Sequence, residues 1–244
     1  MGRGRRGPRP HPAGSVTHSP ESQLFELPAG LGGPTPPAGN PSFLVGEASE
    51  GAVEAPSETI MRVIAGALKG RRLVTPRGAT TRPTADQVRI ALMDALGPWL
   101  PDSRVLDLFA GAGGVGLEAL SRGAASATFV ERDARAVAAL VENIRSLDVE
   151  SRTHVVRGDV GRQLARLEAE GRRFEIVFLD PPYATDVGER ALQALGTGEL
   201  TAPEGLVVAQ HLTKRRPARE YGVLRAFRDR RFGETTLTFF RAGG

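Results

Sequence analysis

The tetrad Asp180-Pro181-Pro182-Tyr183 carries the most specific chemistry in this sequence. It follows an apolar run, residues 175–179, that is typical of a buried strand. Two prolines cannot extend a central strand or donate amide hydrogen bonds, so they stiffen a turn and leave the Pro181 carbonyl as an acceptor. The tetrad therefore predicts a rigid turn at the rim of a cleft, with a carboxylate, a carbonyl and an aromatic ring close together.

This set of groups suits an exocyclic amine on a nucleic-acid base, whose lone pair is delocalised into the ring. If the Asp180 carboxylate and the Pro181 carbonyl accept its two hydrogens, the lone pair is directed at a methyl donor. Tyr183 offers a face on which an extruded base can stack, a contact worth about 1–3 kcal/mol. We therefore predict an in-line methyl transfer that needs neither a metal nor a covalent intermediate. The simpler alternative is a strand followed by a proline turn with an incidental aromatic residue.

A glycine-rich loop, residues 111–116, precedes the tetrad in the sequence Gly-Ala-Gly-Gly-Val-Gly. Gly111 and Gly113 would let the backbone approach a ligand at a helix N-terminus. The loop also matches the dinucleotide fingerprint, so a nicotinamide-dependent oxidoreductase is an alternative. Asp107, two residues before Phe109, would repel a pyrophosphate but accept hydrogen bonds from the amino group of S-adenosylmethionine. The loop therefore favours S-adenosylmethionine, with Asp107, Phe109, Gly111 and Gly113 as cofactor-binding residues.

Two further acids follow apolar runs at positions where a parallel sheet binds ligands. Glu131 stands 18 residues after Gly113 (131 − 113), a spacing at which an acid can accept both ribose hydroxyls of an adenosine. Asp159 could accept from the adenine amino group, although a short acid here is also a helix N-cap. We expect both residues to bind the cofactor.

The elements that must position these residues alternate between apolar runs and helix-length segments. The runs span 105–109, 127–131, 154–156, 175–179 and 205–209, and a helix is predicted over 134–147. This alternation indicates a parallel sheet covered on both faces. Residues 222–230 and 235–241 would add an antiparallel hairpin, completing a mostly parallel, seven-stranded, Rossmann-like α/β fold. Thr84 is expected to cap a helix that begins near Ala85 and ends at Gly97-Pro98.

A basic segment, residues 61–82, contains no acid and has apolar residues spaced as in a short β-hairpin. We expect this hairpin to contact RNA or DNA phosphates, although a solvated ribbon face is the alternative. Its basic residues are Arg62, Lys69, Arg71, Arg72, Arg77 and Arg82.

Residues 1–60 hold 10 of the 18 prolines and 10 of the 30 glycines and show no sustained periodicity. We expect either a disordered tail or an untranslated segment with Met61 as the start. A catalytic domain would then span 83–244.

Composition excludes several classes of protein. Without cysteine there is no disulfide, no thiolate-based metal site and no thiol redox chemistry. No run approaches the roughly 20 apolar residues that cross a bilayer, so we expect a cytoplasmic monomer without membrane contact or metal. A net charge of +4 suits a phosphate-bearing partner.

Taken together, these motifs resemble the D-P-P-Y amino methyltransferases and, among them, the RsmD family, over roughly residues 61–244. The resemblance rests on Met61-Arg-Val-Ile-Ala-Gly, Gly70-Arg-Arg-Leu, Thr81-Arg-Pro-Thr with Asp86, Val88 and Arg89, Asp107-Leu-Phe-Ala-Gly-Ala-Gly, Gly116-Leu-Glu-Ala-Leu-Ser-Arg-Gly, Asp180-Pro-Pro-Tyr and Gly233-Glu-Thr-Thr-Leu.

The resemblance implies methylation of N2 of a guanine in 16S ribosomal RNA, naked or within a small-subunit particle. It implies that Arg82-Pro83-Thr84 forms part of the cofactor and substrate mouth. The tetrad alone does not separate guanine N2 from adenine N6 or cytosine N4, so a DNA amino methyltransferase is the alternative. The chain departs from the family at Gln210, where an acid is expected, and in the following Lys214-Arg215-Arg216.

Overall fold

The computed structural model describes residues 61–76, 83–183 and 185–243, with only the backbone for residues 83–85. The predicted tail, residues 1–60, lies outside the described residues, as do Arg77 and Arg82 of the basic segment. Within the described ranges no helix is long and apolar enough to cross a membrane.

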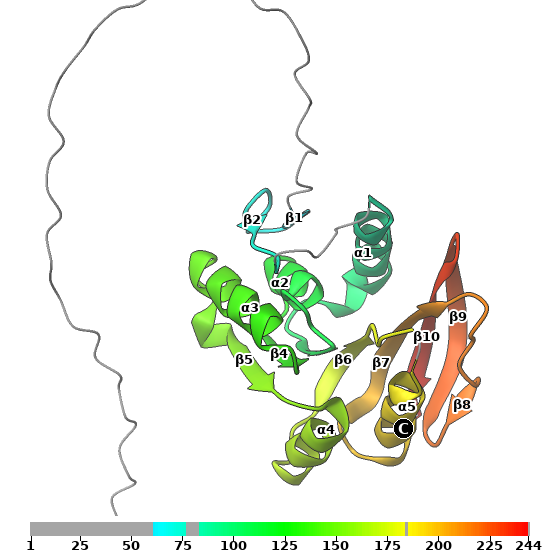
Figure 1. Cartoon of the computed structure of the whole chain (residues 1–244). Coiled ribbons are helices and arrows are strands. Elements are labelled where there is room, and N and C mark those ends of the chain that lie inside the picture. Colours follow the sequence, from blue (N-terminus) through cyan, green and yellow to red (C-terminus); the bar gives the residue numbers. More distant parts are fainter. Residues whose placement is uncertain (1–60, 77–82, 184, 244) are drawn as a thin grey trace, which may run out of the picture. The chain divides into compact units, whose positions relative to one another are not determined.

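One eight-stranded sheet forms the centre of the fold (Figure 1). Its spatial order is β5-β4-β3-β6-β7-β10-β9-β8. The strands are β3 (Arg104–Leu108), β4 (Ser126–Glu131), β5 (Thr153–Arg157), β6 (Phe174–Leu179), β7 (Thr201–Leu212), β8 (Glu220–Tyr221), β9 (Leu224–Phe232) and β10 (Thr235–Ala242).

The five strands β5, β4, β3, β6 and β7 are parallel, and β10, β9 and β8 are antiparallel to their neighbours. The mostly parallel sheet with a C-terminal hairpin is therefore confirmed. The sheet has one strand more than predicted because β8, only two residues long, adds a short edge beyond β9. Its length is too short to leave a period in the sequence.

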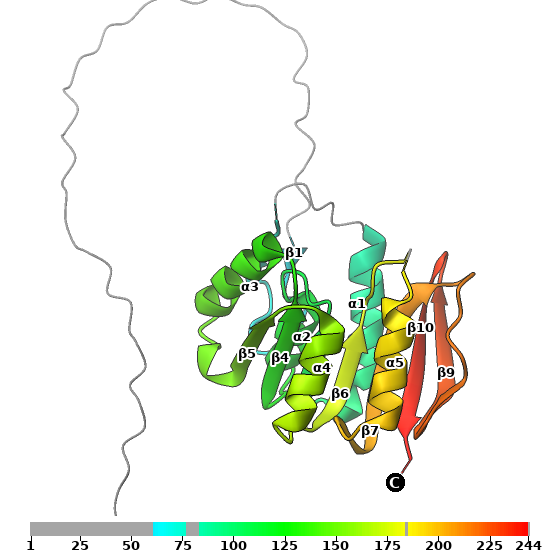
Figure 2. The same cartoon turned by 60° about the horizontal axis from the view of Figure 1, so that its bottom comes forward.

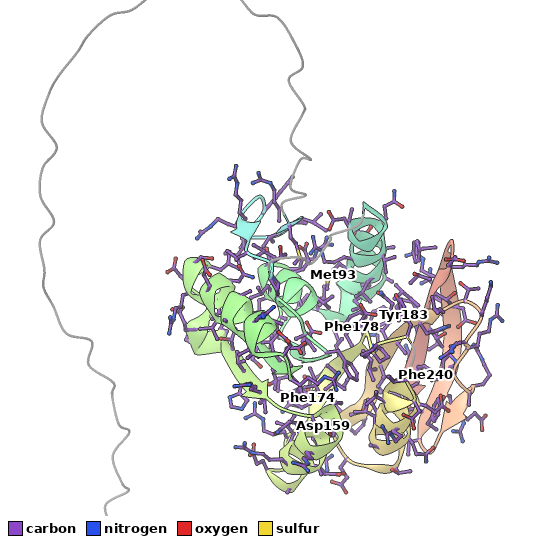
Figure 3. The ribbon with its side chains drawn as sticks, in the orientation of Figure 1. Met93, Asp159, Phe174, Phe178, Tyr183 and Phe240 are labelled. Carbon is purple, nitrogen blue, oxygen red and sulfur yellow. The ribbon has the colours of Figure 1, made fainter. Side chains whose placement is uncertain are left out.

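Helices cover both faces of the sheet (Figure 2) and bury two separate apolar cores. One core lies under α1 (Pro83–Leu96), α2 (Gly114–Ser121) and α3 (Ala134–Ser146), and the other lies under α4 (Val160–Ala169) and α5 (Val187–Thr197). Neighbouring strand residues alternate between them: Leu206 and Val208 pack in the first, and Val207 packs in the second. Figure 3 labels Met93 and Phe178 of the first core and Phe174 and Phe240 of the second.

The predicted helix boundary near Thr84 was wrong, because α1 already begins at Pro83. Proline is favoured in the first turn of a helix, where its missing N–H removes no hydrogen bond. Thr84 therefore lies inside the helix rather than capping it. At the other end the α-helix stops where predicted, and a single 3-10 turn, η1 (Gly97–Trp99), follows. A second 3-10 turn, η2 (Glu150–Arg152), precedes β5.

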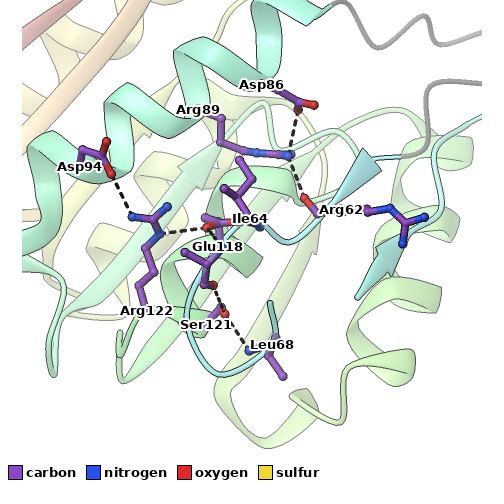
Figure 4. A network of polar contacts seen from close by, with 10 residues as sticks. Arg62, Ile64, Leu68, Asp86, Arg89, Asp94, Glu118, Ser121 and Arg122 are labelled. Carbon is purple, nitrogen blue, oxygen red and sulfur yellow. Dashed lines mark hydrogen bonds and ion pairs between the residues drawn. The ribbon is translucent and has the colours of Figure 1, made fainter. Parts of the chain in front are cut away.

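The N-terminal segment is confirmed as a small antiparallel pair, β1 (Met61–Arg62) with β2 (Arg72–Leu73). A buried carboxylate, Glu118 of α2, holds it in place by accepting from the Ile64 amide at 2.7 Å and the Ala65 amide at 2.9 Å (Figure 4). Ser121, one turn further along α2, accepts from the Leu68 amide at 2.9 Å. Hydrogen bonds to a charged group are worth about 1.5–3 kcal/mol each, so these contacts dock the segment firmly on α2.

Candidate active site

A cavity of about 390 Å³, which we call the main cavity because the tetrad lines it, opens at the carboxyl ends of β3, β4, β5 and β6. Ligands bind at this edge of doubly wound sheets. The cavity is lined by Phe109, Val130, Glu131, Arg132, Gly158, Asp159, Val160, Asp180, Pro181, Pro182, Tyr183, Thr185 and Val187. The whole predicted tetrad and three of the six predicted cofactor residues are therefore brought together.

The tetrad follows directly on β6, so Asp180 is the first residue beyond the buried strand. The turn is closed by the Thr185 amide and hydroxyl, which donate to the Pro182 carbonyl at 3.2 and 2.9 Å. Among the described residues no hydrogen bond uses the Asp180 carboxyl or the Pro181 carbonyl. Burial raises the pKa of Asp180 to about 7. Both acceptors are therefore available to a ligand, and the carboxyl titrates near neutrality.

Tyr183, labelled in Figure 3, is 40% exposed. It is held by contacts from the end of β7 and from the residues that follow that strand. The Gln210 side-chain amide donates to the Tyr183 hydroxyl at 3.2 Å, and the Arg215 guanidinium donates to the Tyr183 carbonyl at 2.9 Å. Sequence reasoning left the roles of Gln210 and Arg215 open. Gln210 therefore holds the Tyr183 ring, and Arg215 holds the Tyr183 backbone.

Glu131, at the end of β4, is fixed by backbone amides. Its carboxylate accepts from the Gly111 amide at 2.9 Å and from the Arg132 and Asp133 amides at 2.8 Å each. A carboxylate has about four lone-pair positions, so an acceptor site remains for a hydroxyl of a ligand. Glu131 thus connects the glycine loop to the cavity wall, and Gly111 itself is not in the lining.

Asp107 lies beneath the cavity rather than in its lining, with 2% of its surface exposed. It accepts from the Gly116 amide in the first turn of α2 at 2.9 Å. Burial, together with the nearby Asp180 and Glu131 carboxyls, raises the pKa of Asp107 to about 7, against the opposing effect of the Gly116 hydrogen bond. In the free protein Asp107 therefore braces the glycine loop at an unfavourable electrostatic cost.

Two glycines of the loop are required by its geometry. Gly113, the residue before α2, has a φ of +86°, and a Cβ there would lie 2.4 Å from Leu140 Cδ1. A Cβ on Gly116 would lie 2.3 Å from Phe129 Cε1, so this glycine lets α2 pack closely on β4. Gly113, like Gly111, shapes the loop without lining the cavity.

Phe109, which does line the cavity, has a φ of +64°, a left-handed backbone that a side chain disfavours by about 1–2 kcal/mol. Strain of this kind concentrates at functional sites, where the surrounding structure imposes it. Its position between β3 and the glycine loop turns the chain into the cavity.

Asp159 is a helix N-cap and also lines the cavity. Its side chain caps α4 by accepting from the Arg162 amide at 3.3 Å, and the residue also lines the cavity. Figure 3 shows it at the start of α4, so the helix cap itself presents the carboxylate to the site.

The predicted phosphate contacts lie away from the cavity. Lys69, Arg71 and Arg72 are exposed on the N-terminal segment and are absent from the lining. Arg71 donates to the Ser146 carbonyl at the end of α3. Arg82 lies outside the described residues, and the side chains of Pro83 and Thr84 are not described, so the predicted mouth is untested.

Sequence reasoning missed Arg132 and Thr185 in the lining, together with the apolar residues Val130, Val160 and Val187. Arg132 directly follows Glu131, and Thr185 stands two residues after Tyr183, so closeness in sequence to a predicted site residue could have indicated both. The side-chain contacts of Gln210 and Arg215 with Tyr183 span 27 and 32 positions and had no such signal.

Comparison with known proteins gives consistent matches. A family model described as "Conserved hypothetical protein 95" matches residues 61–241. The protein named "Ribosomal RNA small subunit methyltransferase D" of Escherichia coli is 37% identical over 150 residues, 62% of this chain and 74% of its own length. A Bacillus subtilis relative, whose name describes it provisionally as an rRNA methyltransferase, is 35% identical over 184 residues, 75% of this chain and all of its own.

A solved structure of a hypothetical protein from Thermus thermophilus superposes with a TM-score of 0.64 at 35% sequence identity. The match covers 74% of this chain and 98% of the Thermus chain. The family model therefore covers residues 61–241, and the fold is shared with the Thermus protein.

Proposed function

The chain belongs to the RsmD family of methyltransferases, and we propose that it transfers a methyl group from S-adenosylmethionine to N2 of a guanine in 16S ribosomal RNA. The fold is the Rossmann-like fold of S-adenosylmethionine-dependent methyltransferases. The observation that carries the proposal is the pair of acceptors, the Asp180 carboxyl and the Pro181 carbonyl, at the rim of an acidic cavity.

The charge of the cavity supports a cationic methyl donor. Glu131, Asp159 and Asp180 line it, Asp107 lies beneath it, and Arg132 is the one basic residue in the lining that the structure describes. A positive ligand would favour the ionised forms of Asp107 and Asp180, whose pKa values are both raised to about 7. A pyrophosphate would instead add negative charge to this site, so the nicotinamide alternative is dropped.

The residues present fit the cofactor. Glu131, held by three amides, would accept from the ribose hydroxyls, Asp159 from the adenine amino group, and Asp107 with the loop of Gly111 and Gly113 would hold the methionine end. When bound, the cofactor supplies a methyl group on a sulfonium, which leaves as a neutral thioether. Phe109 would contact the adenosine from the β3 side.

The chain's own residues act on the amine. Asp180 and Pro181 accept its two hydrogens and hold its lone pair in line with the methyl group, and Tyr183 stacks on the base. After transfer the nitrogen carries a surplus proton. Asp180, with a pKa of about 7, is matched to accept it and to release it to water near neutral pH.

The names of the relatives support ribosomal RNA over DNA. We propose that the substrate is the small-subunit particle or its precursor, that the enzyme acts as a cytoplasmic monomer, and that Lys69, Arg71 and Arg72 contact RNA phosphates. DNA adenine-N6 or cytosine-N4 methylation is the second candidate, because these amines present the same two hydrogens to Asp180 and Pro181.

Methyl transfer from radiolabelled S-adenosylmethionine tests the proposal. Unmethylated 16S RNA, free and in small-subunit particles, is compared with genomic DNA, and the product is identified by nucleoside analysis. The wild type should yield N2-methylguanosine in RNA, and the Asp180→Asn variant should not. Label confined to DNA, or label in RNA that is not N2-methylguanosine, would contradict the proposal.

A further inference from the structure

The catalytic loop, residues 180–183, separates two cavities of opposite charge. The main cavity is lined by three acids and one arginine. A second cavity of about 180 Å³ shares Pro181, Pro182, Tyr183 and Thr185 with the first and lies between α5, the end of β7 and the loop that follows β7. Its charged lining residues are Arg215, Arg216 and Glu189. A methyltransferase of nucleic acid needs such a division, since its cofactor is cationic and its substrate is anionic.

The second cavity is tied to the catalytic loop by side-chain contacts. Arg215 donates to the Tyr183 carbonyl and Gln210 donates to the Tyr183 hydroxyl. The residues that follow β7 therefore start next to Tyr183, on whose ring the target base would stack. An RNA strand bound along these residues would have a defined position relative to Asp180.

From Lys214 to Arg231, 18 residues carry eight basic and two acidic side chains, a net charge of 8 − 2 = +6. The whole chain has a net charge of +4, so the remaining residues sum to −2. We call this segment the C-terminal basic track. Its basic residues are Lys214, Arg215, Arg216, Arg219, Arg225, Arg228, Arg230 and Arg231.

Most of this charge is not neutralised by neighbours. Arg219 pairs with Asp229 and Arg225 pairs with Glu220. Among the described residues, the other six basic side chains of the track form no ion pair with a carboxylate. Such a concentration of unpaired cations is unfavourable in the free protein and complements a polyanion.

The strand register extends the track from the catalytic edge along the sheet. Thr235 of β10 pairs with Leu212 of β7 on one side and with Phe232 of β9 on the other, so β9 ends beside the end of β7. Further along β9, Phe227 is 49% exposed and the Arg241 guanidinium lies 5.4 Å from its ring centroid. Exposed aromatic rings among arginines are typical of surfaces that bind single-stranded nucleic acid.

We propose that the C-terminal basic track binds the phosphates of the RNA strand flanking the target guanine, and that the second cavity receives the adjacent nucleotide. This inference rests on the proposed function and adds to it a substrate surface distinct from the N-terminal segment. An acidic protein would also be attracted by the charge. A basic cavity that shares a wall with the methyl-accepting loop, however, matches a nucleotide.

The test uses the full chain with the double variant Lys214→Gln/Arg216→Gln, which removes two exposed cations and leaves the contacts to Tyr183 intact. The matched control is Arg166→Gln/Arg173→Gln, which removes the same charge from exposed positions outside the track and both cavities. Binding to unmethylated small-subunit particles is measured between about 50 and 200 mM salt, with S-adenosylmethionine affinity and thermal melting as checks on folding.

The slope of log K against log salt is negative, and each lost phosphate contact reduces its magnitude by about 0.7–0.9. We expect the track variant to lose about 1.5 from the magnitude of that slope and to bind about tenfold more weakly, with unchanged cofactor affinity. A slope and affinity equal to those of the control variant would overturn the proposal. Displacement of the wild type from particles by poly-glutamate as effectively as by 16S RNA would assign the track to an acidic protein instead.

The wild type separates failure of this inference from failure of the proposed function. If the wild type methylates the particles and the track variant keeps its salt slope, the inference alone fails. If the wild type binds particles through the track without methylating RNA, the proposed function alone fails.

Discussion

Replacing Asp107 by asparagine should stabilise the cofactor-free protein at pH 8 and weaken its binding of S-adenosylmethionine. The Asp107 carboxyl is buried, and its pKa is raised from 3.8 to about 7. Because this pKa is higher in the folded than in the unfolded state, the stability that Asp107 contributes is fully present below pH 3.8 and is lost as pH rises through 7. The ionised side chain is therefore a cost to the free enzyme at pH 8.

The size of this cost follows from the pKa. A rise from 3.8 to about 7 corresponds to about 4 kcal/mol between the two protonation states. Asparagine keeps an acceptor for the Gly116 amide but adds a buried N–H pair, which costs about 1–3 kcal/mol. We expect a net gain of about 2 kcal/mol at pH 8, or about 4–8 °C in Tm for a domain of this size.

Thermal melting of both proteins without cofactor, from about pH 4 to pH 8.5, measures the difference. Near pH 4 the variant should melt below the wild type, because the Asp107 carboxyl is then protonated in the folded protein and only the cost of the asparagine N–H pair remains. The difference should change sign as pH rises and level off above about pH 7. Asp148→Asn, at an exposed position after α3, is the control and should show no such rise with pH. Calorimetry at pH 8 should show a cofactor affinity at least about tenfold lower for Asp107→Asn.

Two results would refute this reasoning. A lower Tm for Asp107→Asn at pH 8 would mean that the ionised carboxyl stabilises the free protein, contrary to its burial. An unchanged cofactor affinity would mean that Asp107 only braces the glycine loop.

Four further outcomes are expected. Asp180→Asn should lower kcat for RNA methylation by at least about 100-fold while changing S-adenosylmethionine affinity little, as measured by single-turnover assay and calorimetry; full activity would remove the central mechanism. Gln210→Leu should lower kcat about tenfold with unchanged cofactor affinity. Gln210→Glu can accept from the Tyr183 hydroxyl and should therefore keep a kcat close to that of the wild type. An equal loss of kcat in both variants would exclude a positioning role for Gln210. Glu118→Gln should lower the free energy of unfolding by about 1–3 kcal/mol in denaturant melts, because the Ile64 and Ala65 amides lose a charged acceptor, and exposed Glu142→Gln should be neutral. Removal of residues 1–60 should leave methyl transfer unchanged, and loss of activity would show that this segment contributes.

Much of the site could be predicted because it depends on local pattern. An apolar run followed by two prolines indicated the end of β6, and acids after other apolar runs indicated Glu131 and Asp159, which do line the cavity. Parallel strands bring their carboxyl ends to one edge, so residues 49 positions apart (180 − 131) meet without any contact having to be known. The glycine-rich loop at residues 111–116 was likewise recognisable from its local sequence.

The roles that could not be predicted depend on burial and on contacts between distant segments. Asp107 was expected to face a ligand, yet it lies under the cavity and accepts from the Gly116 amide. Its pKa is raised by burial and by the Asp180 and Glu131 carboxyls, which only the tertiary structure brings together. Two-residue strands such as β8 leave no period to detect. The helix start at Pro83 was missed because a threonine and a proline both fit a first turn.

The sequence by itself determined the fold class, the positions of the acids at the ends of parallel strands and the proline turn after β6, since alternating periods and proline turns are properties of short stretches of chain. Only the tertiary structure decided that Gln210 and Arg215 hold Tyr183, that Glu118 docks the N-terminal segment and that a basic cavity adjoins an acidic one. These features depend on contacts between side chains from separate elements, and no local sequence pattern specifies such contacts.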